Sequence, residues 1–178
     1  MSKPCSTLPD PIESKANFVS ALEQIGTEID HQPLRSSALA RIMRETFLGS
    51  DAGGAWDWRK AYDLMQAAAV QALLRGDNSE DDYSAAKLLA SRLLTETRRS
   101  EQQIRLQQFS TPLPFAALVL RAAAIRKGET VLEPSAGTGA LAAFAARAGA
   151  TLLLNEIDPF RQRLLRVVFG GEVTGHDG

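Results

Sequence analysis

Apolar residues change their spacing near residue 107, and this change divides the chain into two patterns. In the first part they recur every three or four positions, in four stretches that turn residues separate. This spacing is typical of amphipathic helices, and no strand-like alternation interrupts it. We therefore predict that residues 1–106 form a helical region, with helices over about 10–29, 33–48, 59–75 and 83–104.

The second part alternates short apolar runs with helical stretches. Strands that alternate with short helices imply right-handed crossovers and a parallel sheet. The expected fold class is α/β, in which the helical region is followed by the first half of a parallel sheet in residues 107–178. Strands are expected at 129–133, 150–156 and from 172, and helices at 111–127 (ended by Gly128), 138–148 and 158–169 (with Asp158 as cap).

Composition narrows the class of protein. Of 178 residues, 44% are hydrophobic and 23% are charged, with a formal net charge of -1, which is typical of a soluble globular protein and unlike a polycation. This net charge does not exclude a local basic surface that binds nucleic acid. The single Cys5 can form no intrachain disulfide, and His31 and His176 are isolated, so we expect no metal site. No secretory signal and no run long enough to span a bilayer occur, so we expect a cytoplasmic protein without a membrane partner.

The stretch "VLEPSAGTGAL", residues 131–141, is the candidate site. A glycine-rich turn between a strand and a helix is where open parallel sheets bind ligands. A Walker phosphate loop is excluded, because no Lys-Ser/Thr pair follows its last glycine. Gly137 and Gly139 fit the G-x-G-x-x-A pattern of dinucleotide-binding proteins, and Glu156 stands near the position expected for their ribose-binding acid. An NAD(P)-dependent oxidoreductase is therefore one interpretation.

Three features favour a different cofactor. Glu133, Pro134, Ser135 and Ala136 widen the loop ahead of the first glycine and supply an acid for a cationic group. Glu156, at the end of the second strand, can accept both ribose hydroxyls, and Ile157 can lie on an adenine face. Thr111, at the start of the preceding helix, combines a hydroxyl with free N–H groups that suit a carboxylate. Together these groups match S-adenosyl-L-methionine better than NAD.

Four segments in this order resemble DNA adenine-N6 methyltransferases. That family has a Q-x-(S/T)-T-P segment, a (D/E)-P-x-x-G-x-G loop, a strand ending in E-I-D-P and a short strand ending in Asp. The corresponding segments here are residues 108–112, 133–139 and 156–159, and "VTGHDG" with Asp177. The resemblance implies a Rossmann-like methyltransferase sheet in which Thr111 and Gly137–Gly139 hold the methionine, Glu156 the ribose, Ile157 the adenine face and Asp177 the adenine amino group.

The leader together with "QQFSTPLPFA" and "GHDG" also resembles large bacterial proteins that join a methylase to a strawberry notch-like helicase. The family's catalytic (D/N/S)-P-P-(Y/F) signature is missing, since every proline of this chain stands alone. We therefore expect a cofactor-binding half that is inactive by itself, with DNA as the partner of a longer parent protein. The first strand would then be left as a sheet edge, covered by a second copy or by a leader helix.

Structural interpretations of the same residues stay open. Gly137 and Gly139 could serve only to close a tight strand–helix connection, and Glu156 could be only a helix-flanking acid. Asp158 is expected to be a cap and not a ligand. A non-enzymatic helical adaptor that keeps a relic methyltransferase fold is a further alternative to the enzyme.

Overall fold

The computed structural model describes residues 14–77, 81–96 and 110–177. Within these residues the chain is α/β, with a small parallel sheet and a majority of helix. The elements are α1 (Lys15–His31), α2 (Ser36–Phe47), α3 (Trp58–Arg75), α4 (Asp82–Arg92), α6 (Leu113–Ala123), β1 (Thr130–Glu133), α7 (Ala140–Arg147), β2 (Thr151–Asn155), α8 (Pro159–Phe169) and β3 (Val173–Thr174).

The described strands form one sheet in the order β1-β2-β3, and both pairings are parallel, as the alternation of strands and helices predicts. Thr130 lies opposite Thr151, and Leu154 lies opposite Val173. Because β2 is central, β1 is an edge strand, which agrees with the expectation for this chain. All three strands end at the same side of the sheet, where the loops that follow β1 and β2 meet.

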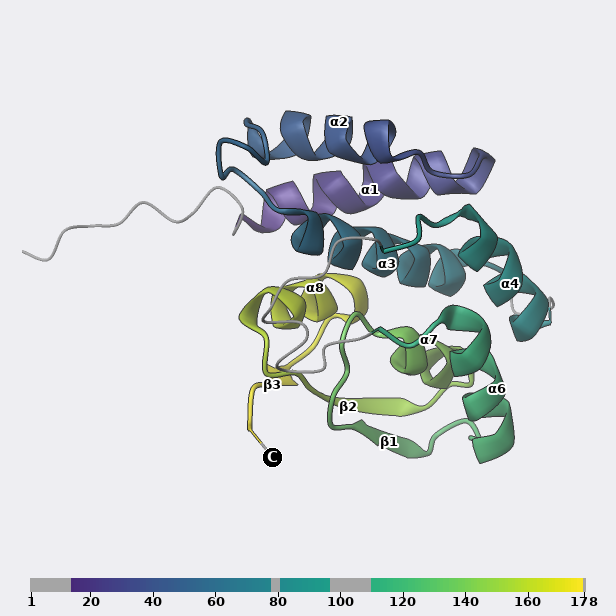
Figure 1. The fold of residues 1–178 in the computed structure, drawn as a ribbon. Helices are drawn as coiled ribbons and strands as arrows, with labels where there is room; N and C mark the ends of the chain where they lie inside the picture. The colour runs from purple at the N-terminus through teal and green to yellow at the C-terminus, as the bar shows by residue number, and fades with distance from the viewer. Residues whose placement is uncertain (1–13, 78–80, 97–109, 178) are drawn as a thin grey trace, which may run out of the picture.

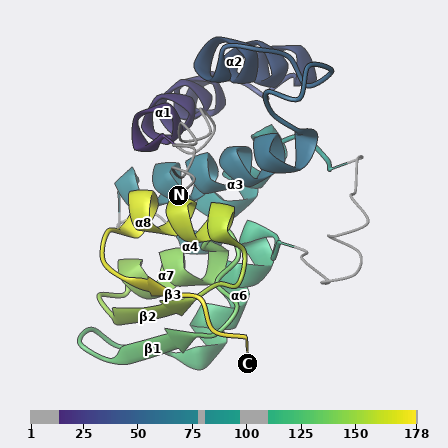
Figure 2. The same cartoon turned by 90° about the vertical axis from the view of Figure 1, so that its left-hand side faces the viewer.

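Most of the described helices stack on one face of this sheet, and α6 lies beside α7 at the end of the strands (Figure 1). α7 and α8 lie directly against the strands, α3 packs on α7 and α8, and α1 and α2 lie beyond α3 (Figure 2). One hydrophobic cluster joins residues of both predicted regions; the Phe18 ring, for example, lies 5.0 Å from the Phe160 ring. The described helices α1 to α4 thus pack on the helical side of the α/β part and do not cover the edge of β1. This differs from one of our two expectations, in which a leader helix covers that edge.

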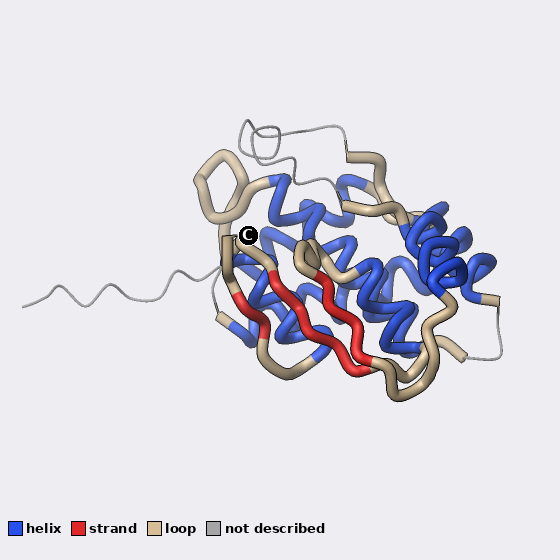
Figure 3. The backbone as a smooth tube through the Cα atoms, turned by 90° about the horizontal axis from the view of Figure 1, so that it is seen from below, coloured by secondary structure: helices blue, strands red, loops and turns tan. Residues whose placement is uncertain are grey.

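The opposite face of the sheet is open. Figure 3 views the molecule from this side, and no described element lies in front of the strands. Leu132 and Leu153, which are register partners on β1 and β2, are 66% and 53% exposed. Large apolar side chains at this level of exposure mark a surface that is suited to contact with another polypeptide.

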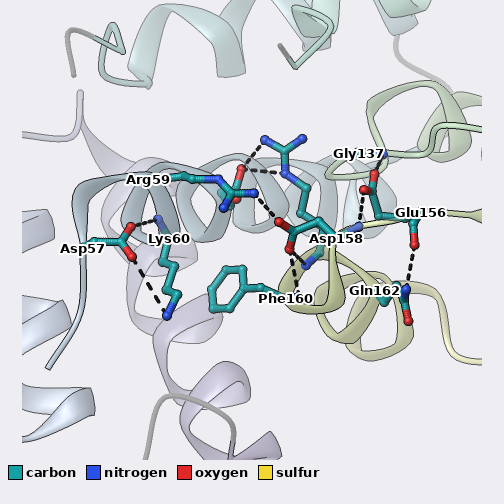
Figure 4. Close-up of polar contacts among 10 residues, drawn as sticks. Asp57, Arg59, Lys60, Gly137, Glu156, Asp158, Phe160 and Gln162 are labelled. Carbon is teal, nitrogen blue, oxygen red and sulfur yellow. Dashed lines mark hydrogen bonds and ion pairs between the residues drawn. The ribbon is translucent and has the colours of Figure 1, made fainter. Parts of the chain in front are cut away.

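Two ion pairs fasten α3 to the start of α8 (Figure 4). Arg59 pairs with Asp158, and Arg161 donates from Nη2 to Asp63 Oδ1 over 2.8 Å. The Asp63–Arg161 pair is almost fully buried, and Asp63 Oδ2 has no hydrogen-bond partner among the residues that the structure describes. Burial raises the pKa of the Asp63 carboxyl, although Arg161 opposes the shift. Such a pair costs desolvation energy, so its main contribution is to fix how α3 lies on α8.

Three of the described helices, α2, α6 and α4, end earlier than their apolar spacing predicts. α2 ends at Phe47, one residue before its predicted end, because Leu48 takes the left-handed conformation (φ 54°). α6 ends at Ala123 for the same reason, since Ala124 has φ 51°, well before Gly128. Residues other than glycine seldom adopt the left-handed conformation, and the local sequence around Leu48 and Ala124 gives no signal of it.

The apolar spacing predicts that α4 continues to about residue 104, but the helix ends at Arg92, and residues 97–104 lie outside the described residues. The Arg92 guanidinium donates to the carbonyl oxygens of Ile29 and Asp30 at the end of α1, over 2.9 and 3.0 Å. Its own carbonyl oxygen accepts from Leu34 N. These tertiary bonds hold Arg92 at the α1–α2 connection, so the chain turns away there. The first helix, α1, starts at Lys15 and not at the predicted residue 10, and residues 10–13 lie outside the described residues.

We predict that Arg161→Leu lowers the free energy of unfolding by about 3 kcal/mol, because it leaves the buried Asp63 carboxylate without its partner. The double change Asp63→Leu with Arg161→Leu should restore stability to within about 1 kcal/mol of the parent, since two apolar side chains replace the pair. Urea unfolding at neutral pH measures both variants. Equal stability of Arg161→Leu and the parent would contradict a buried pair.

The single variant should also acquire a pH dependence of known sign. Without Arg161, the pKa of the Asp63 carboxyl rises further in the folded state, because Arg161 lowers it and burial raises it. A raised folded pKa stabilises the fold at low pH, and that contribution is lost as the pH rises through the folded pKa. Arg161→Leu should therefore lose stability relative to the parent from pH 5 to pH 8, as urea midpoints at both pH values would record. A gain over that range would contradict the assignment.

Candidate functional site

The loop between β1 and α7 contains two glycines with different surroundings. Gly139 has φ 93°, and a Cβ atom there would lie 2.5 Å from the Phe169 ring, so this glycine lets α7 and α8 approach each other. Gly137 has φ 57°, and a Cβ atom there would meet no atom within 4 Å. Gly139 is thus needed for packing, as the structural interpretation proposes, whereas Gly137 leaves open space on the outer side of the loop.

Glu156 lies immediately after β2 and is bonded to the glycine loop (Figure 4). Its Oε2 accepts from Gly137 N over 2.7 Å, and its Oε1 accepts from Asp158 N over 2.8 Å. The side chain is only 5% exposed. The sequence brings Glu156 to the loop as predicted, but the structure commits both carboxylate oxygens to backbone amides and turns neither toward solvent.

Asp158 continues this arrangement into α8. Its Oδ1 accepts from Phe160 N and Arg161 N, so it caps the helix as predicted. Its Oδ2 pairs with Arg59 of α3. The Asp158 carboxylate experiences opposing effects: burial raises its pKa, but Arg59 together with the backbone amides of Phe160 and Arg161 lowers it below the ordinary value. The carboxylate therefore stays ionised and anchors the helical region beside the loop.

Five of the predicted site residues surround one small hollow: Thr111, Glu133, Ser135, Ala136 and Gly137. Its volume is about 30 Å³, which is room for about one water molecule. Glu133 Oε1 accepts from Ser135 N over 3.3 Å, so the acid is partly engaged by its own loop. A cofactor could enter only if the hollow widens.

The remaining predicted residues do not line this hollow. The Pro134 carbonyl oxygen accepts from Asn155 Nδ2. Gly139 lies against Phe169, and Glu156 accepts from Gly137 N. Ile157 is 44% exposed, and Asp177 is exposed on the segment after β3. Both are open to a ligand beyond the carboxyl ends of β2 and β3, next to the loop but outside the hollow.

The start of α6 differs from the expected carboxylate receptor. Its N-cap is Pro112, not Thr111, and no side chain caps it. Pro112 and Pro114 have no N–H group, and Phe115 N already donates to Pro112 O over 2.9 Å. This helix start therefore offers an anion fewer donors than the sequence suggested, and the exposed Thr111 hydroxyl is the main donor left there.

Asn155 is a site residue that the sequence analysis missed. Its Nδ2 donates to Pro134 O and His176 O over 3.0 and 2.9 Å, and its Oδ1 accepts from His176 N over 2.9 Å and from the Thr174 hydroxyl over 2.7 Å. This amide ties the carboxyl ends of all three strands together. The available signal was its position, as a polar residue at the end of an apolar strand.

Gln66 of α3 is the second missed residue. The Thr138 hydroxyl donates to Gln66 Oε1 over 3.0 Å, and Gln66 Nε2 donates to Glu96. Thr138 is 3% exposed, so this bond is buried between the helical region and the loop. No sequence signal could have paired residues 72 positions apart.

The search for a metal centre gave no candidate: within 14–77, 81–96 and 110–177, no three His, Cys, Asp or Glu side chains come together. Among the helices that the structure describes, none has the length and apolar character needed to cross a membrane.

Alanine at the two glycines should separate their roles. Gly139→Ala should lower the free energy of unfolding by about 3 kcal/mol, because it adds a clash with Phe169 to an unfavourable positive φ. Gly137→Ala should cost only about 1 kcal/mol, since its φ lies in the left-handed region and its Cβ meets no neighbour. Urea unfolding of both proteins makes the comparison, and equal losses would argue against the described packing.

The chain was compared with models of protein families, with curated proteins and with solved structures, and none of the three comparisons gave a match.

Proposed function

We propose that the chain binds S-adenosylmethionine and is the cofactor-binding part of a DNA adenine-N6 methyltransferase with a Rossmann-like sheet. The observation that carries the proposal is the meeting of three groups at one edge of a parallel sheet. These groups are Glu133 at the end of β1, Gly137 with its open side, and Glu156 immediately after β2. All three lie at the carboxyl ends of adjacent strands. Ligands of open parallel sheets bind at this edge.

The described residues would divide the cofactor among them. Glu133 faces the hollow beside Thr111, so its carboxylate can meet the ammonium and the Thr111 hydroxyl can meet the carboxylate of the methionine end. The ribose would lie against Glu156, and the adenine would lie beyond it, on Ile157 and near Asp177. Ile157 and Asp177 are already exposed on that side.

Glu156 sets the main energetic condition. An ionised carboxylate has about four acceptor positions, and two are used by Gly137 N and Asp158 N. Ribose hydroxyls can take the others only after the covering groups move, because the side chain is 5% exposed. Part of the binding free energy is then spent on opening the loop, so we expect weak affinity.

The chemistry of the parent protein follows from the cofactor, whose sulfonium makes its methyl group electrophilic. The residues of this chain bind and orient, and none of them can hold the target amine, because the proline-pair signature is missing from the sequence. In the parent, a flipped adenine of DNA would have to be held in line with the methyl group.

The open sheet supports the second part of the proposal, which is a partner at β1. In a parallel strand, the N–H and C=O of one residue both point to the strand on one side, and those of the next residue both point to the other side. Thr151 N donates to Glu129 O, so Thr130 and Leu132 turn theirs away from β2. A second copy of this chain, or the rest of the parent protein, would satisfy these groups and cover Leu132 and Leu153.

A non-enzymatic adaptor is the competing function, and one observation favours it. The two amide bonds and the burial of Glu156 suit a purely structural role, in which the acid only ties the glycine loop to α8. An oxidoreductase that binds NAD(P) through the same glycines is the other alternative. Ligand binding separates the three.

Calorimetry should detect binding of S-adenosylmethionine or S-adenosylhomocysteine and weaker or no binding of NAD. Glu156→Gln should weaken that binding by about ten-fold or more, because a charged acceptor for the ribose is replaced by a neutral amide. Glu172→Gln, an exposed glutamate on the loop before β3, is the matched control and should bind like the parent. Tighter binding of NAD would support the oxidoreductase, and no binding of any of the three ligands would support the adaptor.

Incubation with labelled S-adenosylmethionine and adenine-containing DNA should transfer no methyl groups above background, because the chain supplies no group for the target amine. Scintillation counting of the recovered DNA measures this. Catalytic labelling of adenine would contradict our interpretation of the missing signature.

A further inference from the structure

One face of α3 carries the polar contacts that reach the candidate site. Arg59, Asp63 and Gln66 follow one another at spacings of four and three residues, so their side chains share a face of this helix. Arg59 and Gln66 are two turns apart, about 10 Å along the helix axis. Each of the three is bonded to the α/β part of the chain. Their partners are Asp158 and Arg161 at the start of α8 and Thr138 of the glycine loop.

These contacts are polar, although the helices around them share one hydrophobic cluster. Apolar packing has no preferred direction, whereas a hydrogen bond or an ion pair forms in only one arrangement. Buried polar pairs add little net stability and chiefly fix how two elements lie on each other. The polar face of α3 therefore holds α8 and the glycine loop in one position. Exchange of one of these bonds for another leaves the apolar core in place.

The position that α3 fixes is a closed one. The hollow at the loop has a volume of about 30 Å³, and the Glu156 side chain is 5% exposed. Thr138 lines this hollow and follows Gly137 directly, and its hydroxyl donates to Gln66 Oε1 over 3.0 Å. A loop that moves to widen the hollow carries Thr138 with it, so the bond to Gln66 opposes the opening.

We propose that α3 is an autoinhibitory strap that keeps the cofactor site closed, and that its release raises the affinity for S-adenosylmethionine. The inference rests on the proposed function, because it concerns the regulation of that same site. Coupling of this kind is reciprocal: release of α3 strengthens cofactor binding by the same factor by which bound cofactor favours release. A partner that draws α3 away from the glycine loop therefore activates the site.

Removal of the Thr138–Gln66 bond from either side tests the strap. Thr138→Val keeps the shape of the side chain and loses the hydroxyl, and Gln66→Met keeps the length and loses the acceptor. Each should raise the affinity for S-adenosylhomocysteine about three- to ten-fold in calorimetry, because opening no longer breaks a buried hydrogen bond. Loss of a bond that only supports the site would lower the affinity or leave it unchanged. Gln66 is not among the described residues that line the hollow, so a gain in Gln66→Met comes from no new contact with the ligand.

Thr46→Val is the matched control. Thr46 is a buried threonine of α2, and its hydroxyl accepts from Gln24 Nε2 over 3.4 Å. The change therefore removes the same kind of bond, but between α1 and α2, and it should leave the affinity for S-adenosylhomocysteine unchanged. An equal gain in Thr46→Val would show that general loosening of the fold is the cause, and it would overturn the proposal.

Amide hydrogen exchange at Gly137 reads the strap without a ligand. Gly137 N donates to Glu156 Oε2, and a loop that is freed from Gln66 opens more often. Exchange at Gly137 should therefore be about three- to ten-fold faster in both strap variants and unchanged in Thr46→Val. If none of the proteins binds S-adenosylhomocysteine, the proposed function fails, whereas faster exchange still supports the hold of α3 on the loop. The strap is overturned if Gly137 exchanges at the parent rate in both variants, or if the parent binds S-adenosylhomocysteine and both variants bind it no more tightly.

Discussion

The two hydrogen bonds that the Glu156 carboxylate accepts are the interactions on which the α/β part depends most. The carboxylate accepts one amide from the glycine loop and one from the start of α8, so it joins the segments that follow β1 and β2. A charged acceptor in a site that is 5% exposed makes strong bonds to N–H groups, and losing them would leave a buried charge unsatisfied. The position of Gly137, and with it the form of the hollow, follows from this carboxylate.

The helical region is connected to the same point by two independent routes. Arg59 of α3 pairs with Asp158, whose backbone N–H is one of the two that Glu156 accepts. Gln66, two turns further along α3, accepts the hydroxyl of Thr138, the residue after Gly137. A ligand that displaces the loop must therefore work against α3 as well. The helical region thus supports the candidate site, and binding at the loop should change the surroundings of Arg59 and Gln66 in α3.

Much of the α/β part could be predicted from the sequence, because its signals are local. Pro159 after a capping Asp158, two glycines after an apolar run and a second apolar run were sufficient to predict β1, α7, β2 and α8. The ends of α4 and α6 were not predictable in this way. Arg92 is held by carbonyl groups of α1, and Ala124 takes a left-handed conformation that alanine seldom adopts. At the end of α4, tertiary bonds override a continuing apolar period, whereas at the end of α6 the cause is the backbone conformation of Ala124.

The candidate site shows the same division. The sequence predicts that Thr111, Glu133 and Gly137 come together, and all three line one hollow. It also predicts that Glu156 lies near the glycine loop, because the carboxyl ends of adjacent parallel strands meet at one edge of the sheet, and Glu156 accepts from Gly137 N. It could not show that Glu156 is already bonded on both oxygens, nor that α3 supplies Arg59 and Gln66, since these bonds join residues far apart in the chain. The predicted boundary at residue 107 stays a prediction, although one hydrophobic cluster crosses it.

The central claim is that the Glu156 carboxylate accepts ribose hydroxyls at the acceptor positions that its two amide bonds leave over. A crystal structure of the chain grown with S-adenosylhomocysteine tests this most directly. Our account predicts both ribose hydroxyls on the Glu156 carboxylate, the amino-acid end between Thr111 and Glu133, and a hollow wider than the present 30 Å³. A structure in which the ligand lies elsewhere, while the Glu156 carboxylate stays buried and contacts no ribose hydroxyl, would contradict it.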